Sequence, residues 1–511
     1  MVVQPWREVE ISLTADRDYG SAYTSVDVWA VFTHETGLAL RRPAFWDGGR
    51  IWKVRFAAPG SGRWAWQSFC SLGDAGLAAQ SGEFTSQPDP LISHRFYQHG
   101  FWHMSPGKRS LVHADGAPAI LAADTAWALP WRATENECRV YAADRHNKGF
   151  NAVLLMSVQP DMHALGPRDR NADGGFDVGF EDLPDGHINQ LNPAYFQYLD
   201  LLIGILVEYE LVPVFQPVFQ GFGWKGLDVA GTVVPLNEYA RYCRYLVARY
   251  GARPAIYLVG GDGSGYDPQV PFGGEEIERW DDYQQPTGIH YRPNSDNRAW
   301  QAEPWLDFQW CQTGHQGEHI PERVMDMWRN TPVKAVANGE PTYENTGLPP
   351  LATDWWQGHE AWSNLCAGGT MGVVYGAASL WQWRLHPNEP GHAPRFLAEG
   401  AGWREALDFE GSRYVGLVAR ILDGLPLTDI APDWQISIGR RGLLSPGRLY
   451  IAYSERGGQL PIMSGEQVPL RFRVVDPRTG AVLKEGMRSS ANEAIPDEGG
   501  GPRVYICCNE F

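Results

Sequence analysis

Three observations predict an α/β protein built on a (β/α)8 TIM barrel, with one β-sandwich domain before the barrel and another after it. From about residue 91 to 425, eight short apolar runs alternate with stretches whose apolar residues recur at spacings of three and four. On both sides of this region, apolar and polar residues alternate with a period of two, which is typical of half-buried antiparallel strands. A doubly wound parallel sheet is the alternative for the central region, but that fold has no simple use for eight evenly spaced strands.

The two outer units are predicted to cover residues 1–88 and 429–511. The strands expected in the first unit are Val9–Leu13, Val26–Phe32, Ile51–Phe56 and Trp64–Phe69. Those expected in the last unit are Trp434–Ile438, Arg448–Tyr453 and Val468–Val475. Turn and linker residues such as Ser86-Gln-Pro-Asp-Pro90 separate the first unit from the barrel.

The barrel is predicted to cover residues 89–428. Its expected strands are Ala119–Ala123, Asn151–Ser157, Leu211–Phe215, Ile256–Val259, Gly288–Tyr291, Leu306–Cys311, Val333–Ala337 and Thr370–Tyr375. The expected helices include Glu135–Lys148, Pro193–Tyr209, Leu236–Tyr250 and Ile320–Arg329. Two Gly-rich segments, Gln159–Gln190 and Gln220–Val234, follow the second and third strands, where barrel proteins build their sites. We expect them to shape a pocket, the alternative being surface excursions.

Composition excludes several classes of partner. The 511 residues carry a net charge of −17, which argues against nucleic acid and anionic membranes, since both bind basic surfaces. No apolar run is long enough to span a membrane. Seven cysteines without a CxxC spacing indicate neither a disulfide framework nor a zinc site. With no leader-like N-terminal segment, a cytoplasmic location is expected, the alternative being a secreted protein trimmed of its signal peptide.

Two acids carry the main functional prediction. Asp262 and Glu340 each end an apolar run, Ala255–Asp262 and Val333–Glu340, and a glycine precedes each acid. The glycines are expected to let a ligand approach. In one parallel barrel both acids would lie at the same rim, and two facing carboxylates are the minimum requirement for cleaving a glycosidic bond. The alternative for each acid is a helix N-cap.

Other residues are predicted to bind a carbohydrate substrate. Asp124, which ends the first strand, is assigned to sugar hydroxyls. Aromatic and polar residues near other strand ends complete the predicted substrate-binding set, although core packing is an equal alternative for the pocket walls. These residues are Trp127, Trp224, Gln312, His315, Glu344, Tyr375 and Trp381.

No cofactor or metal is expected. Asp161 and His163 form only a lone D-x-H, and no HExxH, EF-hand or P-loop pattern occurs. The Gly-x-Ser-x-Gly motif of serine hydrolases is also absent.

Several motifs taken in order resemble a known family. They are Ala122-Ala-Asp-Thr-Ala-Trp127, Asp144-Arg-His-Asn-Lys-Gly-Phe-Asn151, Arg249-Tyr-Gly251, Leu258-Val-Gly-Gly-Asp262, Gln312-Thr-Gly-His315, Asn338-Gly-Glu-Pro341 and Tyr375-Gly376. This series resembles the apiosidase-like glycosidases of glycoside hydrolase family 140. The N-terminal unit, with Phe45-Trp-Asp-Gly-Gly49 and Arg55, resembles the β-sandwich that precedes that barrel. The C-terminal unit resembles the collagen-binding-like β-domain that follows it.

The resemblance implies a retaining mechanism with Asp262 as acid/base and Glu340 as nucleophile. It further implies exo action on a terminal furanosidic sugar, such as apiose or arabinofuranose, of a small glycoside or oligosaccharide. Two departures from the family pattern stand out: an Asp in the acid/base role, and Gln357–Glu360, where an arginine is expected. An inverting hydrolase using the same acids and a non-catalytic carbohydrate-binding protein are the alternatives.

Overall fold

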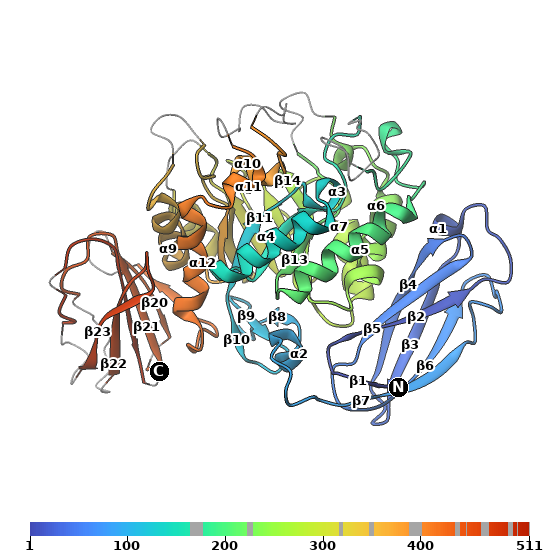
Figure 1. Ribbon diagram of the computed structural model, residues 1–511, viewed down its shortest axis with the longest axis horizontal. Helices are drawn as coiled ribbons and strands as arrows, with labels where there is room; N and C mark the ends of the chain where they lie inside the picture. The colour runs from blue at the N-terminus through green and yellow to red at the C-terminus, as the bar shows by residue number, and fades with distance from the viewer. Residues whose placement is uncertain are drawn as a thin grey trace.

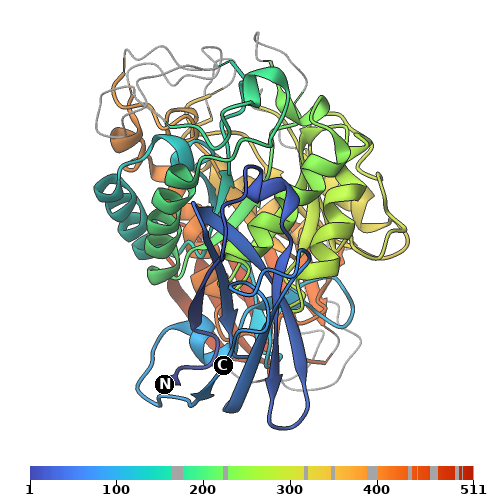
Figure 2. The same cartoon turned by 90° about the vertical axis from the view of Figure 1, so that its right-hand side faces the viewer.

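The computed structural model describes residues 1–163, 177–221, 228–315, 320–346, 352–387, 401–434, 440–445, 447–460, 470–488, 494–497 and 499–509. A central barrel separates an N-terminal β-sandwich from a C-terminal β-sheet unit (Figure 1). Both chain termini lie on the side of the barrel where β8 (Trp102–Met104), β9 (Leu111–His113) and β10 (Pro118–Ala119) lie (Figures 1 and 2). Among the helices in these ranges, none is long and apolar enough to cross a bilayer.

The predicted eight-stranded parallel barrel is confirmed. Its strands are β11 (Leu121–Thr125), β12 (Ala152–Met156), β13 (Val212–Gln216), β14 (Ile256–Gly263), β15 (Thr287–Tyr291), β16 (Phe308–Gln312), β17 (Ala335–Glu340) and β18 (Gly372–Tyr375). Seven consecutive strands pair in chain order from β11 to β17, and β18 pairs with β11. Between β17 and β18, the Met371 N–H donates to the Val336 carbonyl at 3.3 Å, so the sheet is nearly closed.

Amphipathic helices cover the outside of the barrel. The main ones are α4 (Glu135–Lys148), α5 (Pro193–Glu208), α6 (Leu236–Tyr250), α7 (Gln269–Trp280), α8 (Glu322–Trp328), α9 (Trp356–Ala367) and α12 (Glu410–Leu422). The sequence of α4 explains both of its ends. Thr134 and Glu137 form a capping box at its start, and Gly149 adopts a φ of 101° at its C-cap, a conformation that glycine adopts without strain.

Strand alternation sorts the barrel residues into two sets. Leu121, Ala123, Leu154 and Val214 belong to an apolar cluster inside the barrel, whereas their strand neighbours pack against the helices. Towards the carboxyl ends, the inward positions become polar. They are Thr125, Gln216, His290 and Gln312. The barrel is therefore a packed apolar core with a polar layer at its carboxyl-terminal rim.

The N-terminal unit is a seven-stranded sheet that folds over its own core. Its strands are β1 (Val2–Val3), β2 (Glu8–Thr14), β3 (Val28–His34), β4 (Ala39–Gly48), β5 (Ile51–Ala57), β6 (Gly62–Cys70) and β7 (Ser81–Ser86). Buried ion pairs join it to the barrel: Arg249 contacts Asp47 at 2.9 Å and Asp200 at 2.8 Å, and Arg55 contacts Asp200 at 2.6 Å. These partners explain why Asp47, Arg55 and Arg249 occur in the motifs quoted above.

The C-terminal unit contains a six-stranded antiparallel sheet. Its strands are β19 (Ala431–Asp433), β20 (Arg440–Ser445), β21 (Leu449–Ser454), β22 (Leu470–Asp476), β23 (Ala481–Arg488) and β24 (Arg503–Cys508). Tyr453 stacks on Trp362 of α9, and other sheet residues form a separate small core. The strand predicted at Trp434–Ile438 lies mostly outside the described residues. The predicted domain boundaries fall in the connections between β7 and α2 (Arg95–His99) and between α12 and β19.

Candidate active site

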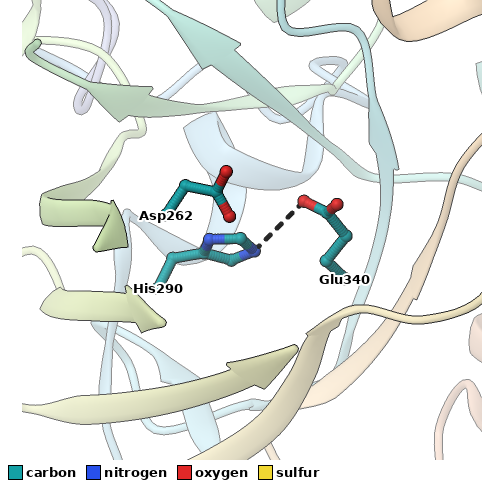
Figure 3. A group of neighbouring side chains, drawn as sticks. All are labelled: Asp262, His290 and Glu340. Carbon is teal, nitrogen blue, oxygen red and sulfur yellow. Dashed lines mark ion pairs between the residues drawn. The ribbon is translucent and has the colours of Figure 1, made fainter. Parts of the chain in front are cut away.

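The barrel brings the two predicted acids together at its carboxyl-terminal rim. One carboxylate oxygen of Asp262, one of Glu340 and a ring nitrogen of His290 all lie within 4.8 Å of one another. The two acid side chains point into a common space beside the imidazole of His290 (Figure 3).

Glu340 owes its orientation to a β-bulge. Cys311 pairs with Asn338 and Gln312 pairs with Glu340, so Gly339 is the extra residue on β17. A bulge re-aims the following side chain. It places Glu340 in register with the inward-facing Gln312, whereas regular alternation would have turned it towards the helices.

Asp262 is the extra residue of a second bulge. Gly261 pairs with His290 and Gly263 pairs with Tyr291, and Asp262 between them has a φ of 59°. A positive φ is uncommon for a residue other than glycine. The predicted strand ended at Val259, but β14 continues to Gly263, so Asp262 lies within the strand and does not follow it.

The glycines beside the acids accommodate protein side chains. A Cβ on Gly261 would lie 1.5 Å from Nε2 of Gln216, and one on Gly339 would lie 2.8 Å from Cδ2 of His290. The expectation that these glycines open the site to a ligand is therefore wrong for Gly261 and Gly339. Their missing side chains let Gln216 and His290 pack against the bulged strands.

Hydrogen bonds favour an ionised Glu340. His315 donates from Nε2 to Oε1 of Glu340 at 2.8 Å, because its Nδ1 accepts the Tyr343 N–H at 3.2 Å. The Tyr343 side chain also hydrogen-bonds Glu340 and accepts from Trp127 Nε1 at 3.1 Å. Burial alone would raise the pKa of Glu340, but the His315 hydrogen bond and the nearby imidazoles and hydroxyl lower it below its usual value. Glu340 is therefore ionised at neutral pH.

His290 contacts Glu340 without a hydrogen bond. Its Nε2 lies 3.6 Å from Oε2 of Glu340, and Trp127 meets the ring edge-on at a centroid distance of 5.6 Å. Burial lowers the pKa of His290, although the charge of Glu340 acts in the opposite direction. His290 is thus a neutral imidazole at neutral pH.

Asp124 is placed away from the cleft. It is fully buried, and its Oδ2 accepts hydrogen bonds from Arg145 Nε at 2.6 Å and Tyr141 Oη at 2.9 Å. It lies on the helix-facing side of β11, beside Tyr375 of β18. This packing argues against the predicted contact with sugar hydroxyls and gives Asp124 a structural role.

Glu344 and Tyr375 also face away from the acids. The Tyr375 hydroxyl donates to Glu344 Oε2 at 2.6 Å, and the Gly411 N–H donates to Oε1 at 3.0 Å. Both residues are buried among the outer helices. The prediction that they bind substrate finds no support in these contacts, which join β18 to α12.

Three predicted residues lie close to the cleft in addition to His315, which hydrogen-bonds Glu340. Gln312 ends β16 beside Glu340, and its Oε1 has no hydrogen-bond partner among the described residues. Trp381 and Trp127 both pack against the apolar cluster inside the barrel. Trp224 lies outside the described residues.

The prediction missed His290, Tyr343 and Gln216. His290 and Gln216 lie within or just beyond predicted strands, and their polar side chains in or next to apolar runs are the signal that could have singled them out. Tyr343 follows β17 in a loop, and its sequence carries no comparable signal.

Two family models match the chain. The model of the apiosidase-like catalytic domain matches residues 105–429, which include the barrel and both acids. A domain of unknown function (DUF5060) matches residues 2–71 of the N-terminal sandwich. No curated protein matches the sequence.

Solved structures share the fold at low sequence identity. A protein described as a glycoside hydrolase is 18% identical, with a TM-score of 0.64 over 81% of this chain and 98% of its own. A family 5 glycoside hydrolase from Bacteroides vulgatus is 19% identical, with a TM-score of 0.67 over 81% and 94%. A candidate glycoside hydrolase from the same organism is 16% identical, with a TM-score of 0.71 over the full length of both chains.

Proposed function

Since the chain belongs to the apiosidase-like family of catalytic domains and is a glycoside hydrolase, we propose that it cleaves its carbohydrate substrate by a retaining double displacement. In this proposal Glu340 is the nucleophile and Asp262 is the acid/base. The sugar released is a terminal furanosidic residue of a small glycoside or oligosaccharide, in keeping with the family to which the chain belongs.

The separation of the two carboxylates supports the retaining assignment most directly. Retaining glycosidases hold their carboxyl groups about 5–5.5 Å apart, and inverting enzymes about 6.5–9.5 Å apart to leave room for a water molecule. An oxygen of Asp262 and an oxygen of Glu340 lie within 4.8 Å of each other, which favours the shorter arrangement. An inverting reaction using the same acids is the alternative. The stereochemistry of the product decides between the two mechanisms.

The hydrogen bonds of Glu340 support its role as nucleophile. His315 donates to Oε1 of Glu340 and the Tyr343 side chain also hydrogen-bonds this carboxylate, which fixes its orientation for attack on the anomeric carbon. As the C–O bond to the leaving group breaks, Asp262 donates its proton to the departing oxygen. In the second step Asp262 takes a proton from water, the water oxygen bonds to the anomeric carbon, and Glu340 leaves as a carboxylate.

A screen of aryl furanosides and pyranosides, followed by NMR of the first anomer released, tests this function. Glu340→Gln and Asp262→Asn should each reduce turnover to background while leaving the melting temperature nearly unchanged. Asp326→Asn, which alters an exposed acid on α8, is the matched control and should retain full activity. Unaltered hydrolysis in either active-site variant would refute the assignment, and an inverted product would refute the retaining mechanism.

A further inference from the structure

We propose that Asp262, His290 and Glu340 also bind a divalent transition-metal ion of the zinc class, and that the bound ion reversibly inhibits the enzyme. The binding claim rests on the three side chains alone. The inhibition claim rests in addition on the function proposed above.

The three side chains form a donor set suited to zinc. Zinc binds imidazole nitrogen and carboxylate oxygen, and its open sites use three protein ligands and leave a fourth position free. Here one imidazole and two carboxylates converge on one point from β15, β14 and β17 (Figure 3). Two ionised carboxylates would balance the charge of a divalent cation.

The distances are close to those that coordination requires. Two ligand atoms that each lie about 2.0–2.1 Å from a tetrahedral ion are roughly 3.4 Å apart. Nε2 of His290 and Oε2 of Glu340 are 3.6 Å apart. The Asp262 oxygen lies within 4.8 Å of both, so a movement of about 1 Å would complete the three-ligand set.

His290 provides the independent reason to expect a ligand here. Its side chain is only 1% exposed, and its Nε2, which lies 3.6 Å from Oε2 of Glu340, has no hydrogen-bond partner among the described residues. Leaving a buried polar group without a partner is costly, and native structures seldom do so without a reason. An imidazole nitrogen that faces two carboxylates and lacks a hydrogen-bond partner is available to coordinate a metal.

The donor set also predicts which ions bind and what they do. Imidazole suits zinc, nickel and copper, whereas magnesium and calcium prefer all-oxygen sites. An ion held by Glu340 would occupy the lone pair needed for attack, and one held by Asp262 would block proton transfer. We therefore expect the ion to compete with the sugar for the same space.

Isothermal titration calorimetry tests the binding. The full chain is titrated with zinc chloride and, separately, with magnesium chloride. Wild type should bind one zinc ion saturably and no magnesium. His290→Phe and Asp262→Asn should each weaken zinc binding more than about tenfold. His99→Asn removes an exposed histidine that hydrogen-bonds Asp115, and should bind zinc as wild type does.

Each outcome decides the proposal. Zinc affinity unchanged in both His290→Phe and Asp262→Asn, or no saturable zinc binding to wild type, would overturn it. Should His290→Phe fail to fold in a thermal melt, the half-buried Asp262 supplies the decisive variant. With an active substrate, zinc should raise KM and leave kcat unchanged, and a chelator should restore the rate. Zinc binding without any hydrolysis would refute the proposed function and leave the metal site standing.

Discussion

Gly339→Ala tests whether the bulge on β17 sets the position of the nucleophile. The new Cβ would lie 2.8 Å from His290 Cδ2 and 2.9 Å from both Cβ and Cε3 of Trp310. Carbon atoms in contact are normally about 3.5–4.0 Å apart, so the overlap is roughly 0.7 Å. Both neighbours are buried in the barrel, so we expect the bulged segment carrying Glu340 to move instead.

The size of the effect follows from that displacement. A misplacement of about 1 Å from the attacking geometry can cost on the order of a hundredfold in rate. Overpacking a dense core usually costs about 1–3 kcal/mol of stability. We therefore expect kcat to fall about a hundredfold, with a modest loss of melting temperature and an intact fold.

The assay compares kcat on the most active aryl glycoside with melting measured by circular dichroism. Gly20→Ala is the matched control, because a Cβ there meets nothing within 4 Å. It should leave kcat and the melting temperature as in wild type. If Gly339→Ala keeps kcat within about threefold of wild type, the bulge does not set the attacking geometry, since the expected loss is about a hundredfold.

Three further predictions follow from the partners of buried charges. His315→Ala removes the strongest contact that lowers the pKa of Glu340, so the acidic limb of the kcat/KM profile should move to higher pH, and an unmoved limb would contradict this. Asp124→Asn should lower the melting temperature but leave KM near wild type, whereas a large rise in KM alone would restore its predicted role in sugar binding. Burial alone would raise the pKa of Asp200, but the charges of Arg249 and Arg55 hold it well below its usual value. The stability Asp200 contributes is therefore present above its unfolded pKa and is lost as pH falls. In urea unfolding at neutral pH, Asp200→Asn should cost about 1–3 kcal/mol, because Arg249 and Arg55 each lose one charged hydrogen-bond partner but keep another, Asp47 and Glu10, and a loss that persists unchanged at pH 2 would contradict this reasoning.

The sequence allowed the barrel to be predicted because its strands are short apolar runs separated by long helical stretches. All eight predicted strands overlap observed ones, and α4 and α6 begin and end at the predicted residues. The strand β4 was missed. Its segment contains Arg41-Arg42-Pro43, which breaks the period of two, and Arg42 is buried against Asp281 of the barrel.

The site could be predicted only in part, for a physical reason. Strands of a parallel barrel are buried on both faces, so their sequence does not reveal which residues point inward. Asp124 and Tyr375 were therefore assigned to the cleft although they face the helices. Bulges add a second uncertainty, because one extra residue reverses the phase of all that follow. Glu340 points into the cleft because of one such bulge, whereas β14 has two, with Val259 and Asp262 as the extra residues.

Trapping the glycosyl-enzyme is the measurement that tests the central claim most directly. Acid quenching during turnover of an aryl glycoside, followed by protease digestion and mass spectrometry, locates any sugar bound to the protein. A retaining reaction through Glu340 predicts one modified peptide, which contains Glu340. Because the glycosyl group replaces the carboxyl hydrogen, this peptide is heavier by the mass of the glycosyl group less one hydrogen. Asp262→Asn should accumulate this adduct if the leaving group needs no protonation, since the second step lacks its base. An unmodified Glu340 peptide together with an inverted anomer in the product would contradict the mechanism.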